Sequence, residues 1–259
     1  MLKAKTPEEI ELMRENAILV SKALAEVGKA VAPGVTTNEL ARIADTFIRD
    51  HGAIPSSLGF EGFPGAICTS VNDVVVHGIP SDYVLKEGDI VTADITTLYK
   101  GYQGDSAYTF PVGEIDADTR HLLDVTKASL YRGIEAAVAG NRTGDIGFAI
   151  QSYVEANGCS VVRELEGHGL GKEMHEAPGV PNYGRPGHGA RLMDGLVICI
   201  EPMICAGSRG VYVGRDRWSV HTSDHRNSAH YELTVVVRKG RAEVLSTFDY
   251  IEKDGNIRF

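Results

Sequence analysis

The chain has 259 residues, of which 43% are hydrophobic, enough to bury a core in one large domain or two small ones. Its 26 basic and 35 acidic residues give a formal charge of −9, which argues against a nucleic-acid site or an anionic membrane surface, because phosphate recognition needs clustered Lys and Arg. We find no targeting segment and no run of about 18 apolar residues, so we expect a cytoplasmic protein whose four cysteines stay reduced.

Two helices are predicted at the start of the chain. Thr6-Pro7-Glu8-Glu9 is a helix-start signal, and the apolar-periodic run behind it stops before Pro33-Gly34. Either Thr36 or Thr37 then caps a second helix, which ends at His51-Gly52.

A β-hairpin is predicted after a strand-like stretch at residues 66–76. Residues 90–97 alternate and are rich in β-branched side chains, Lys100-Gly101 indicates a turn, and residues 102–112 form the returning strand. Asp94 and Asp105 then lie within a residue or two of direct cross-strand register, so both carboxylates can face one pocket. A buried, unpaired carboxylate is costly, and a cation is one of the few partners that makes it tolerable.

The same kinds of element return in the second half. Asp116 or Asp118 starts a helix that reaches about Gly140, and Thr143 starts another that ends at Asn157-Gly158. Three strands are expected after these helices, at residues 160–166, 196–204 and 231–238.

The two halves match each other when the chain is shifted by 106 or 107 residues. The matched pairs include Gly34 with Gly140, Thr37 with Thr143, Gly52 with Gly158, Gly88 with Gly195, and Asp94 with Glu201. Chance similarity between amphipathic helices is the alternative explanation. No Ser-Gly or Pro-rich linker separates the halves, so we expect residues 1–259 to form a single pseudo-symmetric domain.

Five side chains of the metal-binding type stand inside recognisable local phrases. They are Asp94 (GDIVTAD), Asp105 (GDS), His168 (GHGLG), Glu201 (IEP) and Glu232 (YELT). Any one of the acidic residues alone would ordinarily be a solvated surface group. Together, four carboxylates and one imidazole indicate a site for two bridged divalent cations.

The order and spacing of these phrases, with VHGIP around His77 and MHE around His175, resemble type I methionyl aminopeptidases of the bacterial or organellar kind. The match covers nearly the whole chain. It implies the α+β pita-bread fold, in which a curved antiparallel sheet with pseudo-two-fold symmetry is backed by helices. It also implies a dinuclear centre held by Asp94, Asp105, His168, Glu201 and Glu232, with Co, Mn or Fe as the metal.

The resemblance assigns three catalytic residues. Glu201 is both a metal ligand and the general acid/base, while His77 and His175 flank the scissile amide, toward its nitrogen and toward its carbonyl oxygen respectively. Taken alone, His77 could be a turn residue and His175 a surface residue.

By the same resemblance, a methionine pocket is lined by Phe60, Phe63, Cys68, Met174 and Trp218. The alternative is that these are ordinary core residues. For Phe60 and Phe63 we favour contact with a ligand, because both lie on a glycine-rich stretch and exposed aromatics on loops are more often contact groups. The resemblance also implies, more weakly, a monovalent cation near Asn72, Val74 and Ser228.

Several positions depart from the commonest family pattern. Phe60 and Phe63 stand where tyrosines are frequent, Ser57 replaces a cysteine, and Met174 replaces a phenylalanine. His230 replaces the usual Gln two residues before Glu232, and Leu233 replaces the usual His just after it. All five ligand positions are intact, so these changes bear on pocket dimensions and on how neighbours orient Glu232.

We therefore expect an aminopeptidase that removes the initiator methionine from nascent polypeptide N-termini when the second residue is small. We also expect a monomer that associates transiently with the ribosome. One alternative is a proline dipeptidase-like metallopeptidase of the same fold, disfavoured because residues 1–60 are too short for the extra N-terminal domain of those enzymes. Another is an inactive peptide-binding or ribosome-binding relative, which should have lost a ligand or one of the two histidines.

Overall fold

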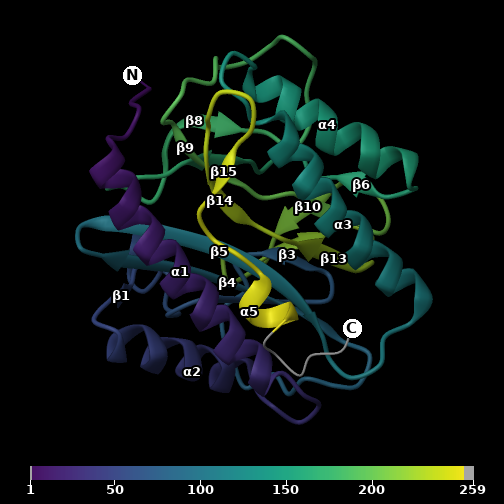
Figure 1. Ribbon diagram of the computed structural model, residues 1–259. Helices are drawn as coiled ribbons and strands as arrows, with labels where there is room; N and C mark the ends of the chain where they lie inside the picture. Colours follow the sequence, from purple (N-terminus) through teal and green to yellow (C-terminus); the bar gives the residue numbers. More distant parts are fainter. Residues whose placement is uncertain (1, 254–259) are drawn as a thin grey trace.

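The computed structural model describes residues 2–253, in which two pairs of helices lie outside a set of antiparallel strands (Figure 1). In Figure 1 the first pair, purple to blue, lies at the lower left, and the second pair, in teal, lies at the upper right. The expected α+β architecture, with an antiparallel sheet backed by helices, is confirmed. None of the helices among the described residues combines the length and the hydrophobicity that a membrane span requires.

The helices begin where the sequence predicts. Thr6 caps α1 with a reciprocal pair of hydrogen bonds to Glu9, Thr36 caps α2, and Asp116 caps α3. The four long helices are α1 (Pro7–Ala30), α2 (Thr37–Asp50), α3 (Ala117–Ala136) and α4 (Thr143–Ala156), and a short α5 (Asp249–Glu252) follows near the end.

Helix α3 ends four residues before the expected Gly140. The Ala139 N–H donates to the carbonyl of Arg238, and the Gly140 N–H donates to the carbonyl of Leu192. Because these backbone groups pair with distant segments, they are not available to continue the helical ladder.

The strands are short apart from one long hairpin. They are β1 (Ile54–Pro55), β2 (Cys68–Val71), β3 (Val74–Val76), β4 (Ile90–Tyr99), β5 (Tyr102–Pro111), β6 (Ser160–Val161), β7 (Gly167–Gly169), β8 (Glu176–Val180), β9 (Val197–Ile200), β10 (Met203–Cys205), β11 (Val211–Val213), β12 (Val220–Thr222), β13 (Ser228–His230), β14 (Leu233–Val236) and β15 (Glu243–Val244), with a 3-10 turn η1 (Phe60–Gly62).

Two predicted strands are divided in the structure. The stretch 66–76 breaks into β2 and β3 at Asn72, whose φ of 52° turns the chain. The stretch 196–204 breaks into β9 and β10 at Pro202, which has no N–H to offer a ladder. The stretch 160–166 forms a strand only over β6, while strands β1, β7, β8, β11, β12, β13 and β15 were not predicted.

The predicted hairpin is confirmed, and it joins the two halves of the molecule. Lys100 and Gly101 both have positive φ, as the two-residue turn between β4 and β5 requires. Strand β5 then meets the segment leading into β14, because the Glu232 N–H donates to the carbonyl of Ala107 and the Thr234 hydroxyl donates to the carbonyl of Asp105. Since β14 pairs with β9 and β9 pairs with β7, the order across this surface is β4, β5, β14, β9, β7.

The backbone repeats the internal match seen in the sequence. Helices α2 and α4 each have 14 residues and begin at the matched threonines Thr37 and Thr143. Before them, Gly34 and Gly140 have φ of 94° and 104°, and they donate to the carbonyls of Leu85 and Leu192 respectively. The other matched glycines have similar backbone conformations, with φ of 74° at Gly52 and 78° at Gly158, and of 88° at Gly88 and 84° at Gly195.

One large hydrophobic cluster draws residues from both halves, from Leu19 on α1 to Ile251 on α5. A shared core of this kind favours one folding unit. The single domain over residues 1–259 nevertheless stays a prediction, and residues 1 and 254–259 lie outside the described part of the chain.

Candidate metal centre and substrate pocket

Two of the five metal-type side chains come from the hairpin. In the register of β4 and β5, Asp94 lies opposite Ala107 and Asp105 lies opposite Thr96, so the two carboxylates are diagonal neighbours on one face. The expectation that they lie within two residues of direct register is confirmed.

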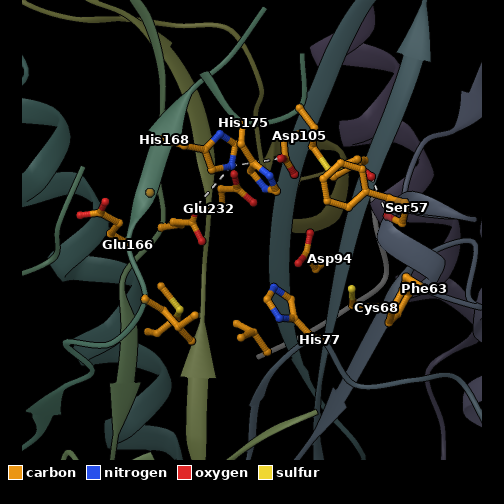
Figure 2. A pocket seen from close by; sticks show the side chains of 18 of the residues that line it. Ser57, Phe63, Cys68, His77, Asp94, Asp105, Glu166, His168, His175 and Glu232 are labelled. Atoms are coloured by element: carbon orange, nitrogen blue, oxygen red, sulfur yellow. Dashed lines mark hydrogen bonds and ion pairs between the residues drawn. The ribbon is translucent and has the colours of Figure 1, made fainter. Parts of the chain in front are cut away.

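The other three come from the strands that follow across the surface. Glu232 immediately precedes β14 and Glu201 immediately follows β9, and their neighbours Leu233 and Ile200 are direct cross-strand partners. His168 is the middle residue of β7. Five adjacent segments thus each supply one side chain to a common centre, where His168, Asp105 and Glu232 lie together in Figure 2.

His168 is oriented toward the carboxylates. Its Nε2 lies 3.6 Å from Asp105 Oδ2 and 3.5 Å from Glu201 Oε1, the interactions dashed in Figure 2. Its Nδ1 lies 3.0 Å from the carbonyl oxygen of Gly169, which suits an N–H donor at that position. Nε2 then keeps its lone pair for the centre, the arrangement typical of a metal-binding histidine. The main-chain carbonyl of Glu201 is held by the side-chain amide of Asn182, at 2.9 Å.

The carboxylates at this centre repel one another. Burial raises the pKa of Asp105, Glu201 and Glu232 well above the usual range, and repulsion between neighbouring carboxylates raises each pKa further. Burial also raises the pKa of Asp94. Burial lowers the pKa of His168 to about 4, so its imidazole is neutral at physiological pH. A cation would relieve the repulsion, and a neutral imidazole can bind one.

The donor atoms fit a divalent metal. Asp105 Oδ1 and Glu232 Oε1 are buried and have no hydrogen-bond partner among the described residues, although buried polar atoms normally have one. Ligand atoms of Asp105, His168 and Glu232 all lie within 4.8 Å of one another, and carboxylate and imidazole donors suit Mn, Fe and Co.

Cys199 is a neighbour that the sequence did not single out for this centre. Its sulfur belongs to the same group of candidate ligand atoms and lies 3.6 Å from the Thr234 hydroxyl. Burial and the surrounding carboxylates raise the pKa of the thiol well above its usual range. The thiol therefore stays protonated and neutral, and such a group is a poor metal ligand.

A cavity of about 540 Å³ opens over the centre and is lined by all twelve residues assigned to metal, catalysis and the methionine pocket. His77 and His175 are both among its walls. The His175 ring meets the His168 ring edge to face at 4.5 Å and the Phe60 ring at 5.4 Å. Burial lowers the pKa of both histidines, that of His77 to about 4, which favours the neutral imidazole in each.

One side of the cavity is apolar. Phe63 and Trp218 meet edge to face at 5.1 Å, and Cys68 lies opposite Asp94 in the register of β2 and β4. Phe63 is 4% exposed, so the expectation of an exposed loop aromatic is wrong for it, because its ring turns inward onto Trp218. Val76, Leu165 and Met203 also line the cavity and were not predicted. The only sequence signal for Met203 was its position just after the Glu201-Pro202 phrase.

The three residues assigned to a monovalent cation lie together but do not line this cavity. The Ser228 N–H donates to the Asn72 carbonyl at 2.9 Å. The Asn72 side chain donates to Asp89 and accepts from the N–H of Ile90, so its polar atoms serve the fold. Val74 begins the adjoining strand β3.

Comparison with known proteins places these features in context. The sequence model of metallopeptidase family M24 matches residues 11–239 of this chain. Methionine aminopeptidase of Clostridium acetobutylicum is 49% identical over 247 residues, which cover 95% of this chain and 99% of the relative. Methionine aminopeptidase 1 of Bacillus subtilis is 48% identical over 246 residues, with the same two coverages.

Solved structures show the same likeness. The crystal structure of methionine aminopeptidase from Rickettsia prowazekii has a TM-score of 0.94 at 41% identity and covers 95% of this chain and 100% of that one. The prolidase from Pyrococcus furiosus has a TM-score of 0.77 at 24% identity, covering 94% of this chain and 65% of the other, and so shares the fold.

Proposed function

This chain belongs to metallopeptidase family M24, and from that premise we propose that it is a metal-dependent aminopeptidase that removes the N-terminal methionine of new polypeptides when the second residue is small. One observation carries the proposal. The cavity joins an apolar wall to a cluster of carboxylates and imidazole that suits divalent metal.

The apolar wall supports recognition of methionine. A thioether is recognised by contact rather than by hydrogen bonds, and Phe63, Cys68, Met174 and Trp218 offer contact surfaces without charge. Phe60 lines the same cavity beside His175.

We assign two divalent cations to Asp94, Asp105, His168, Glu201 and Glu232, with Mn, Fe or Co as the metal. When bound, such cations supply a water nucleophile at neutral pH and electrophilic help at the carbonyl group. The protein's own part is to hold the donors rigidly, which the paired strands do.

Proton transfer is assigned to the Glu201 carboxylate. It accepts a proton from the attacking water as the new C–O bond forms, and returns a proton to the amide nitrogen as the C–N bond breaks. The neutral His175 donates an N–H to the carbonyl oxygen as negative charge develops there, and His77 contacts the amide nitrogen. The products are free methionine and the shortened peptide.

We further propose that the protein works in the cytoplasm as a monomer, with the N-termini of nascent polypeptides as its partners and a transient association with the ribosome. The supporting observation is the function itself, because initiator methionine becomes available as chains leave the ribosome. A monovalent cation near Asn72, Val74 and Ser228 remains a weaker proposal, since the Asn72 side chain is already hydrogen-bonded.

A peptide assay tests the proposed function. Purified protein loaded with Mn, Fe or Co under anaerobic conditions should release Met from Met-Gly-Met, and excess chelator should reduce release to background because the centre loses its cations. Met-Leu-Met should be a poor substrate, and the dipeptide Met-Pro controls for a proline dipeptidase. Preferential cleavage of Met-Pro, or no release with any of the three metals, would contradict the proposal.

A further inference from the structure

His230 is a buried histidine beside the candidate centre whose ring makes no hydrogen bond to the described residues. It ends strand β13 and is 1% exposed. Neither Nδ1 nor Nε2 has a hydrogen-bond partner among the described residues. A buried polar group without a hydrogen bond costs free energy, so we expect a ligand to bind this imidazole.

The main chain of His230 is held rigidly. Its N–H donates to the Thr109 hydroxyl at 3.0 Å, and the same hydroxyl donates to its carbonyl at 2.7 Å. Across the other side, His230 lies opposite Met203 in the register of β10 and β13. Strands on both sides therefore fix the backbone from which the ring projects.

The ring stands against Glu201. Its Nε2 lies 3.6 Å from Glu201 Oε2, while His168 Nε2 lies 3.5 Å from Glu201 Oε1. The Glu201 carboxylate thus has one imidazole at each oxygen. His168 also lies 3.6 Å from Asp105. The two imidazoles therefore face different oxygens of the Glu201 carboxylate.

These separations are those of atoms that share a cation. An N–O distance of 3.6 Å is too long for a hydrogen bond. Metal bonds of about 2.1 Å place two donors on one ion roughly 3.0 to 4.2 Å apart, from a right angle to a straight line. A neutral imidazole has one ring nitrogen whose lone pair is free to bind a metal.

We propose that His230 is a sixth protein ligand of the metal centre, supplying an imidazole on the Oε2 side of Glu201 as His168 does on the Oε1 side. The inference rests on the proposed dinuclear centre and deepens it. By the family resemblance Gln is usual at this position, so the ligand would be particular to chains with this substitution. With one imidazole on each cation, the centre should favour Fe and Co over Mn more strongly than a centre with a single imidazole.

His168 should be the stronger of the two ligands. Its Nδ1 is hydrogen-bonded to the Gly169 carbonyl, and such a partner raises the basicity of the other nitrogen. His230 has no such partner among the described residues. Replacing His230 should therefore weaken metal binding by about 10-fold or more at one of the two sites, and replacing His168 should weaken it further.

Proton NMR of the Co(II)-loaded protein tests the proposal without relying on activity. An imidazole bound to Co(II) gives a strongly shifted, solvent-exchangeable N–H signal. We expect two such signals from the unaltered protein, one lost in His230→Gln and the other in His168→Gln. His225→Gln is the matched control, since His225 is exposed and its Nδ1 lies 2.9 Å from Asp73.

The number of shifted imidazole signals from the unaltered protein tests the proposal even if a variant fails to fold. A single shifted imidazole signal overturns the proposal, as does a His230→Gln protein that keeps both signals. Calorimetric titration with Co(II) should show the weakened second site in His230→Gln, and unchanged binding there would also overturn it. Release of Met from Met-Gly-Met by the same Co(II)-loaded sample tests the proposed function separately, because it can persist with either number of histidine ligands.

Discussion

Glu201 is the residue on which the proposed chemistry depends most. Asn182 holds its main-chain carbonyl, and its two carboxylate oxygens face His168 and His230. Burial and the charge of Asp94 raise the pKa of its carboxyl group well above the usual range. A carboxylate with a raised pKa is a better proton acceptor, which is why enzymes place general bases in such surroundings.

Replacing Glu201 by Gln should abolish turnover while the fold survives. The amide has nearly the same shape but cannot accept the proton, so we expect kcat to fall by roughly 100-fold to 10,000-fold. Peptide release measured beside a thermal melt and a metal analysis separates chemistry from folding and from lost metal. Glu155→Gln, on exposed α4 surface, is the control. A folded, metal-loaded Glu201→Gln protein with near-normal kcat would falsify the assignment.

The hairpin of β4 and β5 is the element that sets the spacing of the two aspartates. Helix α1 supports it through Asn16, which is fully buried. The Asn16 amide donates to the carbonyls of Thr97 and Tyr102, at 3.1 and 2.9 Å, and accepts from the Thr97 hydroxyl at 2.6 Å. One side chain thus joins both strands next to the turn.

Asn16→Ala should destabilise the protein, because it leaves two carbonyls and a hydroxyl without partners in a buried place. At about 1 kcal/mol for each lost hydrogen bond, we expect a loss of roughly 2 to 4 kcal/mol in the free energy of unfolding. Urea unfolding of the metal-free protein measures it. Asn38→Ala, which removes an exposed bond to Asp82, should cost well under half as much. Equal losses in the two variants would show that Asn16 does not support the hairpin.

Across the whole molecule, the two halves bring four carboxylates together in one buried centre. Burial and mutual repulsion raise the pKa of Asp105, Glu201 and Glu232 above the ordinary values of 3.8 for Asp and 4.5 for Glu. A carboxyl group whose pKa is higher in the folded state than in the unfolded state adds to the free energy of unfolding, and this contribution is fully present when the pH is below the unfolded-state pKa. The contribution is lost as the pH rises through the folded-state pKa.

The gap in stability between metal-loaded and metal-free protein should therefore widen as the pH rises from about 5 to 8. Repulsion grows in the metal-free centre over that range, while cations at 100 times their dissociation constant stabilise the loaded protein by about 2.7 kcal/mol per site. Thermal melts with Mn(II) or with chelator at several pH values measure the gap. A gap that is constant with pH, or that narrows, would contradict a carboxylate-held centre.

Much of the site could be predicted from the sequence because its signals are local. The two-residue turn and the alternation around it predict the hairpin that carries Asp94 and Asp105, and the caps predict where the long helices begin. The family phrases predict the rest of the centre, and His168, Glu201 and Glu232 all line the cavity. The ends and divisions of elements were less predictable. Helix α3 stops early because its last backbone groups pair with residues far along the chain.

By itself, then, the sequence determined the hairpin of the two aspartates, the starts of the long helices, the internal repeat, the family and the candidate set of five metal-type residues. Only the tertiary structure decided that β5 lies beside the Glu232 segment, that Phe63 turns inward, and that His230 and Cys199 stand beside the carboxylates. The physical reason is that the direction of a strand's side chains is local, whereas the neighbour that they face depends on pairing between segments more than a hundred residues apart.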